Sequence, residues 1–286
     1  MINAQNLRQI KSRIKSIANT RKITRAMEMV SASKLSRVKV SFSSTKAYLD
    51  VLEETLHDLL SDLPDAKNAL LDKRTQVKNS TLCVVTSDTG LCGVYNNDVI
   101  KYAEQVSRSL KSPRISIIAV GREGYNHFQK NGFHVANSYL GLYGRYSPDL
   151  SDKITEDLIR MFVKGETDEV YVIYSHFRIS LRHEPMAERL LNIDPPPRPR
   201  RYYIFEPSAG VILDSLIPRY AAYKMREILL EAFTSEHSAR MLAMKIATDN
   251  ADDLTEQLTL ARNKARQFAI TKEVLEISAS SEALKG

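Results

Sequence analysis

Apolar residues recur in steps of three and four near both ends of the chain, and that spacing is typical of a heptad seam on a helix. After Gly210 no glycine occurs before Gly286, and the last proline is Pro218. A helix over the part beyond Pro218 would be roughly 100 Å long at about 1.5 Å per residue, so it needs a partner. The carboxy-terminal seam, interrupted at Lys272, is predicted to consist of Leu254, Leu258, Ala261, Ala265, Phe268 and Leu275.

The amino-terminal stretch also predicts a long helix, because residues 1–63 contain neither glycine nor proline. Its apolar stripe is regular at both ends and changes phase in the middle, where we expect only loose coiling around a partner. The regular parts are Leu7, Ile10, Ile14 and Ile17, followed later by Leu49, Leu52, Leu56, Leu59 and Leu63. Between them, Ile23, Met27 and Val30 are predicted to continue the stripe.

The middle of the chain has the pattern of a globular α/β region, since all ten prolines and nine of the ten glycines lie between Pro64 and Pro218. Short apolar runs there alternate with amphipathic stretches, which favours a mostly parallel sheet covered by helices. The predicted strands are residues 81–87, 114–120, 133–139 and 169–177, with a possible edge strand at 202–206. The predicted helices are residues 97–110, 121–130 and 151–163.

These patterns predict three parts: an amino-terminal helix over residues 1–63, a central α/β domain over 64–207 and a carboxy-terminal helix over 208–286. The entry and exit points of a compact domain commonly lie close together, so the two helices can return against each other. We therefore expect a long antiparallel coiled coil of the terminal helices plus a central Rossmann-like α/β domain. The first and last residues should lie toward its far tip.

Charge is concentrated at the amino terminus. The whole chain carries +7, while residues 1–40 alone carry ten Lys or Arg against the single acid Glu28. Such an arm is typical of a surface for phosphate backbones, for an anionic membrane or for acidic proteins. The arm has no aromatic residue before Phe42, which argues against nucleic acid, and its apolar stripe favours a helical partner. From the residues alone, these possibilities stay open.

Candidate chemistry in the middle of the chain is weak. The turn at residues 87–93, SDTGLCG, follows a strand as a phosphate loop would, but it lacks the third glycine of the dinucleotide fingerprint and the GK[ST] of a P-loop. A tight structural turn is the better interpretation. The six histidines show no metal-ligand spacing, and Cys92 has no histidine placed beside it by the sequence. Two cysteines are too few for a disulfide framework. We expect no catalytic residue, cofactor or metal.

Polar residues also occur at intervals along the carboxy-terminal helix, among them Asn250, Asn263 and Arg266. They could form an ordinary solvated face. Alternatively, this tip could work as a bearing inside a ring of other subunits. No run of about 18 apolar residues occurs, and the start MINAQNLRQIKSRIKS lacks the apolar segment of a secretory signal.

Three long motifs give the chain a resemblance to the gamma subunit family of F-type ATP synthases. The amino-terminal motif is IKSRIKSIANTRKITRAMEMVSASKL at residues 10–35, and the central motif is TSDTGLCGVYNN at 86–97. The carboxy-terminal motif combines SEHSARMLAMKIATDNADDL at 235–254 with LTLARNKARQFAITKEVLEI at 258–277. Both ends and the middle occur in the family's order and spacing, so the resemblance covers the whole chain.

The resemblance implies a central rotor stalk that couples proton flow through the membrane sector to conformational cycling of the catalytic beta subunits, in ATP synthesis and reversible hydrolysis. Such a subunit is not itself an enzyme. Its implied partners are the hexameric ring of alpha and beta subunits, the epsilon subunit and the c-ring, with no nucleic acid and only indirect membrane association through the c-ring. The absence of a transit peptide and of a chloroplast-type insertion predicts a bacterial subunit at the cytoplasmic face of the plasma membrane.

The resemblance also implies residues for ring contact and coupling. Met27 matches the family position near the regulatory loop of the beta subunit, and Arg266 with Gln267 matches a pair that hydrogen-bonds a catch loop of beta. The matched positions are Met27, Arg240, Arg266, Gln267, Thr271 and Glu273. The chain departs from the family pattern at Thr89, Val94, Ala261, Arg262 and Phe268, so the details of the bearing contacts are expected to differ.

Overall fold

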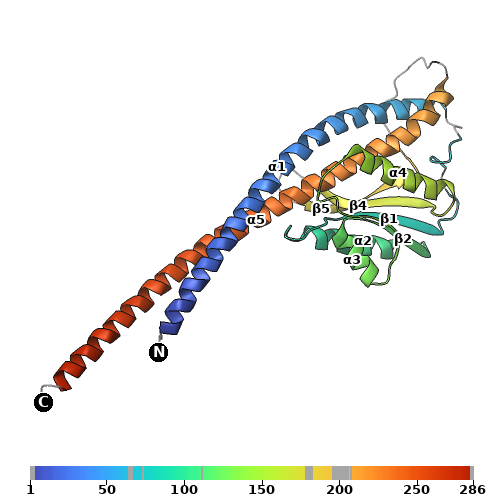
Figure 1. The fold of residues 1–286 in the computed structure, drawn as a ribbon. Coiled ribbons are helices and arrows are strands. Elements are labelled where there is room, and N and C mark those ends of the chain that lie inside the picture. The colour runs from blue at the N-terminus through green and yellow to red at the C-terminus, as the bar shows by residue number, and fades with distance from the viewer. Residues whose placement is uncertain are drawn as a thin grey trace. The chain divides into compact units, whose positions relative to one another are not determined.

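The structure is a computed structural model that describes residues 4–63, 67–72, 74–110, 112–177, 183–194, 206 and 208–283 (Figure 1). The chain forms two compact units: unit 1 consists of Met1–Val30 with Met241–Gly286, and unit 2 of Ser31–Arg240. The helices are α1 (Ala4–Asp62), α2 (Tyr95–Ser109), α3 (Arg122–Lys130), α4 (Pro148–Val163) and α5 (Ala209–Ala283). The strands are β1 (Asn79–Val85), β2 (Arg114–Val120), β3 (His134–Tyr139), β4 (Glu169–Phe177) and β5 (His183–Leu191).

Unit 2 contains a five-stranded sheet in the order β3-β2-β1-β4-β5. The first four strands are parallel and β5 pairs antiparallel with β4 at one edge. The register places Cys83 of β1 opposite Ile118 of β2 and Val172 of β4. The predicted mixed α/β fold with a mostly parallel sheet is confirmed.

Each face of the sheet is covered by a different set of helices, with α2 and α3 on one side and α4 on the other (Figure 1). Alternate residues of β1 point to opposite faces, as the pleat requires. Leu82 and Val84 belong to the apolar cluster shared with α2 and α3. Cys83 and Val85 belong to the larger cluster, which includes residues of α4, α5 and α1.

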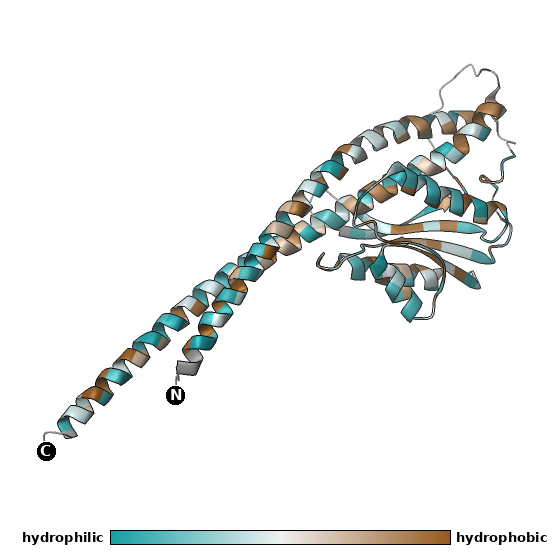
Figure 2. Ribbon diagram, in the orientation of Figure 1, coloured by the Kyte–Doolittle hydropathy of each residue, from teal (hydrophilic) through white to brown (hydrophobic). Residues whose placement is uncertain are grey.

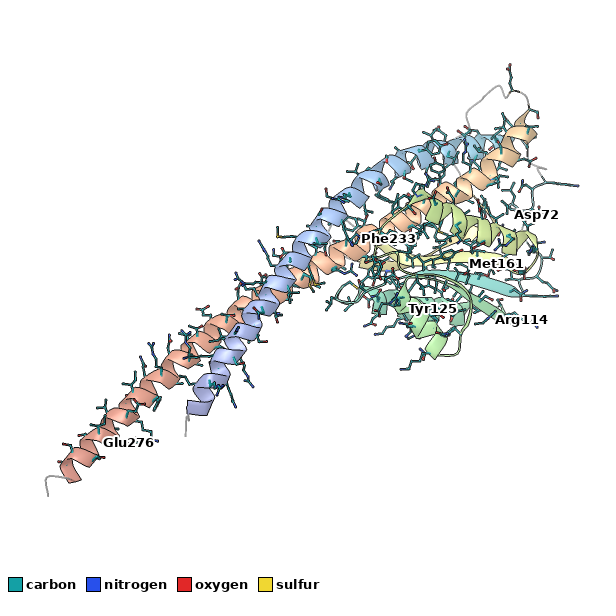
Figure 3. All side chains as sticks on the ribbon, in the orientation of Figure 1. Asp72, Arg114, Tyr125, Met161, Phe233 and Glu276 are labelled. Carbon is teal, nitrogen blue, oxygen red and sulfur yellow. The ribbon has the colours of Figure 1, made fainter. Side chains whose placement is uncertain are left out.

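The parts of α1 and α5 in unit 2 run antiparallel and bury apolar side chains against the sheet. The ring centroids of Tyr48 on α1 and Tyr223 on α5 lie 4.3 Å apart. The hydroxyl of Tyr220, which precedes Tyr223 by three residues, donates to the carboxylate of Glu53, which follows Tyr48 by five residues. Phe233, in the first half of α5, is buried in the large cluster on the sheet side (Figure 3). The buried apolar residues of this part of α1 are Leu35, Val38, Leu49, Leu52, Leu56 and Leu59.

One strand of unit 2 was missed by the sequence analysis. Strand β5 was not predicted, because its sequence HEPMAERLL is charged and contains Pro185, a pattern that is tolerated only at a sheet edge. Helix α5 begins at Ala209, close to the start at residue 208 that was predicted, and Pro218 lies inside it. An interior proline costs about 3 kcal/mol, but Leu213 and Ile217 beside it are buried, so packing holds the helix together. Apart from Glu206, the predicted edge strand at 202–206 lies outside the described residues.

Unit 1 consists of the first part of α1 and the last part of α5, which are also antiparallel. The hydroxyl oxygens of Thr24 and Thr248 lie 2.8 Å apart, and Arg21 pairs with Asp252 one turn farther along. This direction is what the sequence predicted for the terminal helices. The coiled coil itself and the division at residues 63 and 207 stay predictions, since each compact unit contains parts of both helices.

Candidate functional site

The contact between the two helices of unit 1 combines small and polar side chains with apolar ones, such as the half-buried Ile10 and Ile14 on α1 and the buried Met244 on α5. Thr24 on α1 and Thr248, Ala251 and Ala265 on α5 are buried there. One series of buried and half-buried positions on α5 advances in alternating steps of four and three residues, which is the repeat of a heptad seam. They are Met244, Thr248, Ala251, Thr255, Leu258, Arg262 and Ala265.

This seam differs from the predicted one. Leu254 and Phe268 were predicted to face the partner helix, but they are exposed, Phe268 to 58%. On α1, Ile23 was predicted in the stripe and is 60% exposed, while the neighbouring Thr24 is buried. Other parts of the predicted pattern agree with the structure: Leu7, Ile10, Ile14 and Ile17 of α1 are half-buried. On α5, Leu258 and Ala265 lie on the observed seam, so the errors concern individual positions of the two stripes.

Many large apolar side chains of unit 1 are exposed. Brown, apolar positions recur along the final third of α5 in Figure 2. Large contiguous apolar patches on a soluble surface indicate a partner, whereas single exposed apolar residues need no explanation. We call this set the outer apolar surface; it consists of Ile23, Met29, Val30, Ile246, Leu254, Leu260, Phe268, Ile270, Val274, Leu275 and Ile277, all exposed.

The end of α5 carries part of this surface and has no other described helix beside it. The register set by Thr24–Thr248 and Arg21–Asp252 brings Leu7 near Ala265, the last buried residue of α5. Every side chain described from residue 266 to 282 is exposed. Figure 1 shows α5 continuing past the start of α1, and Glu276 lies on this segment in Figure 3. A single helix of this length is marginally stable in water, so we call residues 266–282 the bare tip.

Four of the six residues implied by the family resemblance lie on the bare tip. Arg266, Gln267, Thr271 and Glu273 are all exposed there. Gln267 and Thr271 are one turn apart, so they share a face, and the Thr271 hydroxyl donates to the Gln267 carbonyl oxygen at 3.0 Å. Met27 is half-buried on α1 in unit 1.

Arg240 is in unit 2, and its surroundings are different. Its side chain is 7% exposed, and Nη1 donates to Oε1 of Glu236 at 2.6 Å. Nη2 donates to the carbonyl oxygen of Thr89 at 2.8 Å and Nε to that of Gly90 at 3.4 Å. The guanidinium therefore bonds to residues of unit 2, a contact that its sequence position alone did not reveal.

The turn at residues 87–93 has the hydrogen bonds of a structural turn. The Asp88 carboxylate accepts from the backbone N–H groups of Arg122, Gly141 and Tyr143, at distances of 3.1, 3.0 and 2.7 Å. It thereby joins the start of α3 to the loop after β3. Two carbonyls of the same turn accept from Arg240. The turn therefore connects α3, the loop after β3 and α5 through its acceptor groups, as a structural turn does.

The two thiols of the sheet region are free and buried. Burial raises the pKa of Cys83 to about 12. Burial is also the main reason that the pKa of Cys92 is raised, although Arg240 and the Ser87 hydroxyl act in the opposite direction. A raised pKa keeps a thiol protonated and unreactive at neutral pH. The packing interpretation of Cys92 is therefore favoured over an activated thiol.

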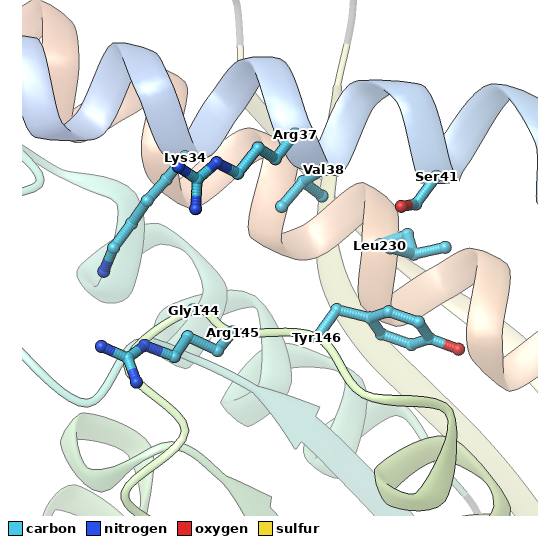
Figure 4. A pocket seen from close by; sticks show the side chains of 8 residues that line it. All are labelled: Lys34, Arg37, Val38, Ser41, Gly144, Arg145, Tyr146 and Leu230. Atoms are coloured by element: carbon cyan, nitrogen blue, oxygen red, sulfur yellow. The ribbon is translucent and has the colours of Figure 1, made fainter.

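Unit 2 also has a basic pocket of about 460 Å³ between α1 and the loop before α4 (Figure 4). Its cations are Lys34, Arg37 and Arg145, and Val38 and Leu230 give it apolar walls. The Lys34 ammonium donates to the Tyr143 carbonyl oxygen at 3.1 Å. The pKa of Lys34 is lowered, chiefly by burial and further by Arg145 and Arg240, although Glu236 raises it. The basic arm of the sequence thus places positive charge around an opening that suits an acidic partner group.

Two searches of the described ranges gave no positive result. Within residues that the structure describes, no group of three or more His, Cys, Asp or Glu side chains is arranged to hold a metal ion. None of the described helices combines the length and apolar character needed to cross a membrane.

A family model described as ATP synthase matches residues 6–284. The chain is 37% identical over 291 residues to the ATP synthase gamma chain of Chlorobium phaeobacteroides (strain BS1), with 98% of this chain and 99% of the relative covered. It is 38% identical over 284 residues to the ATP synthase gamma chain of Pelotomaculum thermopropionicum (strain DSM 13744 / JCM 10971 / SI), with the same coverage.

Solved structures have the same fold. A chain in the cryo-EM structure of the Euglena gracilis mitochondrial ATP synthase, OSCP/F1/c-ring in rotational state 3, matches with a TM-score of 0.69 at 16% identity, covering 99% of this chain and 95% of that one. A chain of the Tetrahymena thermophila mitochondrial ATP synthase central stalk and c-ring matches with a TM-score of 0.60 at 20% identity, covering 79% and 99%. Because the family model and relatives above 30% identity span almost the entire sequence, the chain belongs to the ATP synthase gamma chain family, a family of non-catalytic subunits.

Proposed function

We infer that this chain is the central stalk of an F-type ATP synthase. As a rotor it couples proton flow through the membrane sector to conformational cycling of the catalytic beta subunits, in ATP synthesis and in the reverse hydrolysis. One observation carries the inference: the large apolar side chains of the outer apolar surface stay exposed although the two helices of unit 1 pack against each other. A surface of this kind is stable in water only when a partner covers it.

We propose that the partner is the hexameric ring of alpha and beta subunits and that the helices of unit 1 turn inside it as an antiparallel coiled coil. Apolar contact is non-directional, so a helix can move past it without breaking specific bonds. The outer apolar surface therefore suits a bearing better than a fixed interface rich in hydrogen bonds. The bare tip would be ordered by the ring, which supplies the packing that a single helix lacks.

We propose specific contacts with the ring at the residues implied by the family resemblance. Arg266 and Gln267 would bond to a catch loop of beta, and Thr271 and Glu273 would face the ring next to them. Their exposure on the bare tip supports this assignment. Met27 would lie near the regulatory loop of beta. Arg240 was assigned to the same set, but its hydrogen bonds to Thr89 and Gly90 favour an indirect contribution through the position of α5.

We propose that the basic pocket receives acidic loops of the ring. Neither Arg37 nor Arg145 has a side-chain hydrogen bond or ion pair within the described parts of the chain. Their guanidinium groups are thus available to carboxylates, which they match in geometry. This proposal gives the charge of residues 1–40 a protein partner, as the family resemblance implied, instead of nucleic acid.

The remaining partners and the location follow from the same family. We propose that the α/β part of the chain, nominally residues 64–207, stands with the epsilon subunit on the c-ring at the cytoplasmic face of a bacterial plasma membrane. In this arrangement residues 1–63 and 208–286 supply the shaft. The structures that match this chain come from assemblies that contain a c-ring.

Co-purification with ring subunits tests the proposed function. The full chain mixed with alpha and beta subunits should elute in gel filtration as a stable complex with ATPase activity. The chain by itself should have no ATPase activity, since the catalytic groups belong to beta. If the chain elutes separately from a properly assembled ring, the proposed function is wrong.

A further inference from the structure

One turn of α5 is unusually polar for a buried helix. Glu236 and His237 are fully buried, as are Ser235 and Ser238 on either side of them, and Arg240 is nearly so. Replacing a buried ion pair by apolar residues of similar size is often neutral or stabilising, so stability alone does not explain the pair formed by Glu236 and Arg240. The directions of its hydrogen bonds point to another purpose.

These residues attach α5 to two separate loops of the α/β part of unit 2. Arg240 donates to the carbonyl oxygens of Thr89 and Gly90 in the turn after β1. The Nε2 atom of His237 lies 2.9 Å from the carbonyl oxygen of Gly144, in the loop before α4. We call the set of Glu236, His237, Arg240 and the carbonyl groups that they contact the α5 clamp.

Gly144 is matched to this contact. Its φ of +63° is one that other residues rarely adopt, and a Cβ atom there would lie 2.5 Å from Cε1 of His237. The loop can therefore approach the helix this closely only with glycine at this position. Burial lowers the pKa of His237 to about 4, and the nearby cations Arg240 and Lys34 act in the same direction. The ring is therefore neutral at pH 7 and donates from Nε2 to the carbonyl.

Two further contacts hold the same part of the helix from other directions. The Tyr95 hydroxyl, from α2, donates to the carbonyl oxygen of Ala232 at 3.2 Å. The hydroxyl oxygens of Ser175 on β4 and Ser235 on α5 lie 3.0 Å apart. Hydrogen bonds require both a distance and an angle, whereas apolar contacts tolerate sliding. Bonds from several sides therefore resist rotation of α5 about its own axis.

We propose that the α5 clamp is the joint through which rotation of the α/β part of the chain is transmitted to α5. Glu236, His237 and Arg240 are positioning residues in this account, since they fix the helix and touch no substrate. The inference rests on the proposed function, because torque has a meaning only for a rotor. Beyond the proposed function, it assigns the α5 clamp as the set of residues through which that torque passes.

The test uses the complete complex reconstituted in vesicles, with ATP hydrolysis and ATP-driven proton pumping measured on the same preparation. Arg240→Gln removes the charge-assisted bonds to Thr89 and Gly90. The control is Arg219→Gln, on the same helix, because Arg219 is exposed and forms no side-chain bond within the described part of the chain. We expect Arg240→Gln to assemble and hydrolyse ATP, while protons pumped per ATP hydrolysed fall at least about fivefold. The control should keep the wild-type ratio.

A second pair of variants covers the case in which Arg240→Gln fails to assemble. His237→Leu removes the donor to Gly144, whereas His237→Gln keeps an N–H donor at similar reach. The ratio of pumping to hydrolysis should fall in His237→Leu and be restored in His237→Gln. A purely structural role would lower the amount of complex in these variants and leave that ratio unchanged.

The outcomes separate the two claims. If the wild-type chain does not assemble with the ring, the proposed function is wrong. A wild-type complex that pumps, together with Arg240→Gln and His237→Leu complexes that keep the wild-type ratio, overturns the clamp and leaves the proposed function standing.

Discussion

The same two helices are built differently in the two units of the molecule. In unit 2 the buried apolar residues of α1, including Leu49, Leu52 and Leu56, pack into the core beside the sheet. In unit 1 few side chains are buried, Thr24 and Met244 among them, and many large apolar residues are exposed. Both parts follow steps of three and four residues. The spacing therefore indicates that each helix has a partner. Whether the large apolar residues are buried or exposed indicates whether they pack within the chain or against another subunit.

Because of this contrast, similar apolar residues in the two units stabilise different things. Leu56 is completely buried and stabilises the chain itself, whereas Leu260 is 65% exposed and can stabilise only a complex. Burying a leucine side chain contributes about 1.5–3 kcal/mol wherever it occurs. The account therefore predicts that truncations in unit 2 change folding and truncations in unit 1 change binding.

The largest effect is expected for Leu56→Ala. The substitution leaves a cavity in the large cluster of unit 2 and should lower the free energy of unfolding by about 2–5 kcal/mol. Urea unfolding of the isolated chain measures it. The matched variant Leu260→Ala should change the same quantity by less than about 0.5 kcal/mol, because its side chain is exposed. Equal losses from the two variants would contradict the contrast between the units.

The pH dependence of stability should be the next largest effect, and it tests the buried polar residues of unit 2. The pKa of His237 is about 4 in the folded chain and about 6.5 when unfolded. Because the folded value is depressed, the unfolded chain binds the proton first, and stability is lost as the pH falls from about 6.5 to 4. That loss amounts to about 3 kcal/mol at most.

His237→Gln isolates this contribution, since glutamine keeps a donor for Gly144 and does not titrate. Urea unfolding at pH 7 and pH 5 should show the wild type losing more stability than the variant on acidification. The raised pKa of Glu236, caused mainly by burial, acts in the opposite direction in both proteins and largely cancels in the comparison. Parallel pH profiles would argue against a buried neutral histidine.

A smaller effect is expected in the seam of unit 1. Thr248→Val removes the hydroxyl that lies 2.8 Å from that of Thr24, which still donates to the Arg21 carbonyl oxygen at 3.1 Å, so the loss should be about 0.5–1 kcal/mol. The double variant Thr24→Val with Thr248→Val removes both hydroxyls and should recover most of that loss. Thermal unfolding followed by helical circular dichroism measures both. A double variant that is worse than the sum of the singles would show that the hydroxyl pair does not act as a unit.

The smallest change concerns one exposed valine on each unit. Val274 on the bare tip and Val163 at the end of α4 are 58% and 55% exposed, so Val274→Ser and Val163→Ser should leave the stability of the isolated chain almost unchanged. Binding to the ring of alpha and beta subunits should weaken about fivefold for Val274→Ser alone, since about 1 kcal/mol of apolar burial is lost. Titration calorimetry against the assembled ring would distinguish them, and equal affinities would count against the bearing.

Much of the fold could be predicted because its strongest signals are local. The absence of glycine and proline identified the length of α1, and the apolar runs TLCVVTS and EVYVIYSHF indicated two central strands. Strand β5 gave no such signal, since an edge strand need not be apolar and its proline argued against a strand. The unit 1 seam was predicted in part: Leu7, Ile10, Ile14 and Ile17 are half-buried as expected, whereas Ile23, Leu254 and Phe268 are exposed.

The candidate site divides in the same way. The exposure of Arg266, Gln267, Thr271 and Glu273 agrees with a partner-facing role, yet these residues were identified through the family resemblance and not from their spacing. The contact between Arg240 and the turn at residues 87–93 joins positions about 150 residues apart, so no local pattern could reveal it. Gly144 and the charged sequence SEHSAR did offer a sign of this contact. A glycine costs conformational entropy on folding and a buried charge costs desolvation energy, so each indicates a specific contact that requires it.

Hydrogen exchange of the bare tip tests the central claim most directly. Amides of residues 266–282 would be followed by mass spectrometry in the isolated chain and in its complex with alpha and beta subunits, with a peptide of β1 as the internal control. Because a single helix is marginal in water, the account predicts rapid exchange of the tip in the isolated chain and strong protection in the complex, while β1 is protected in both. Equally rapid exchange of the tip in an intact, active complex would contradict the claim that the ring covers this surface.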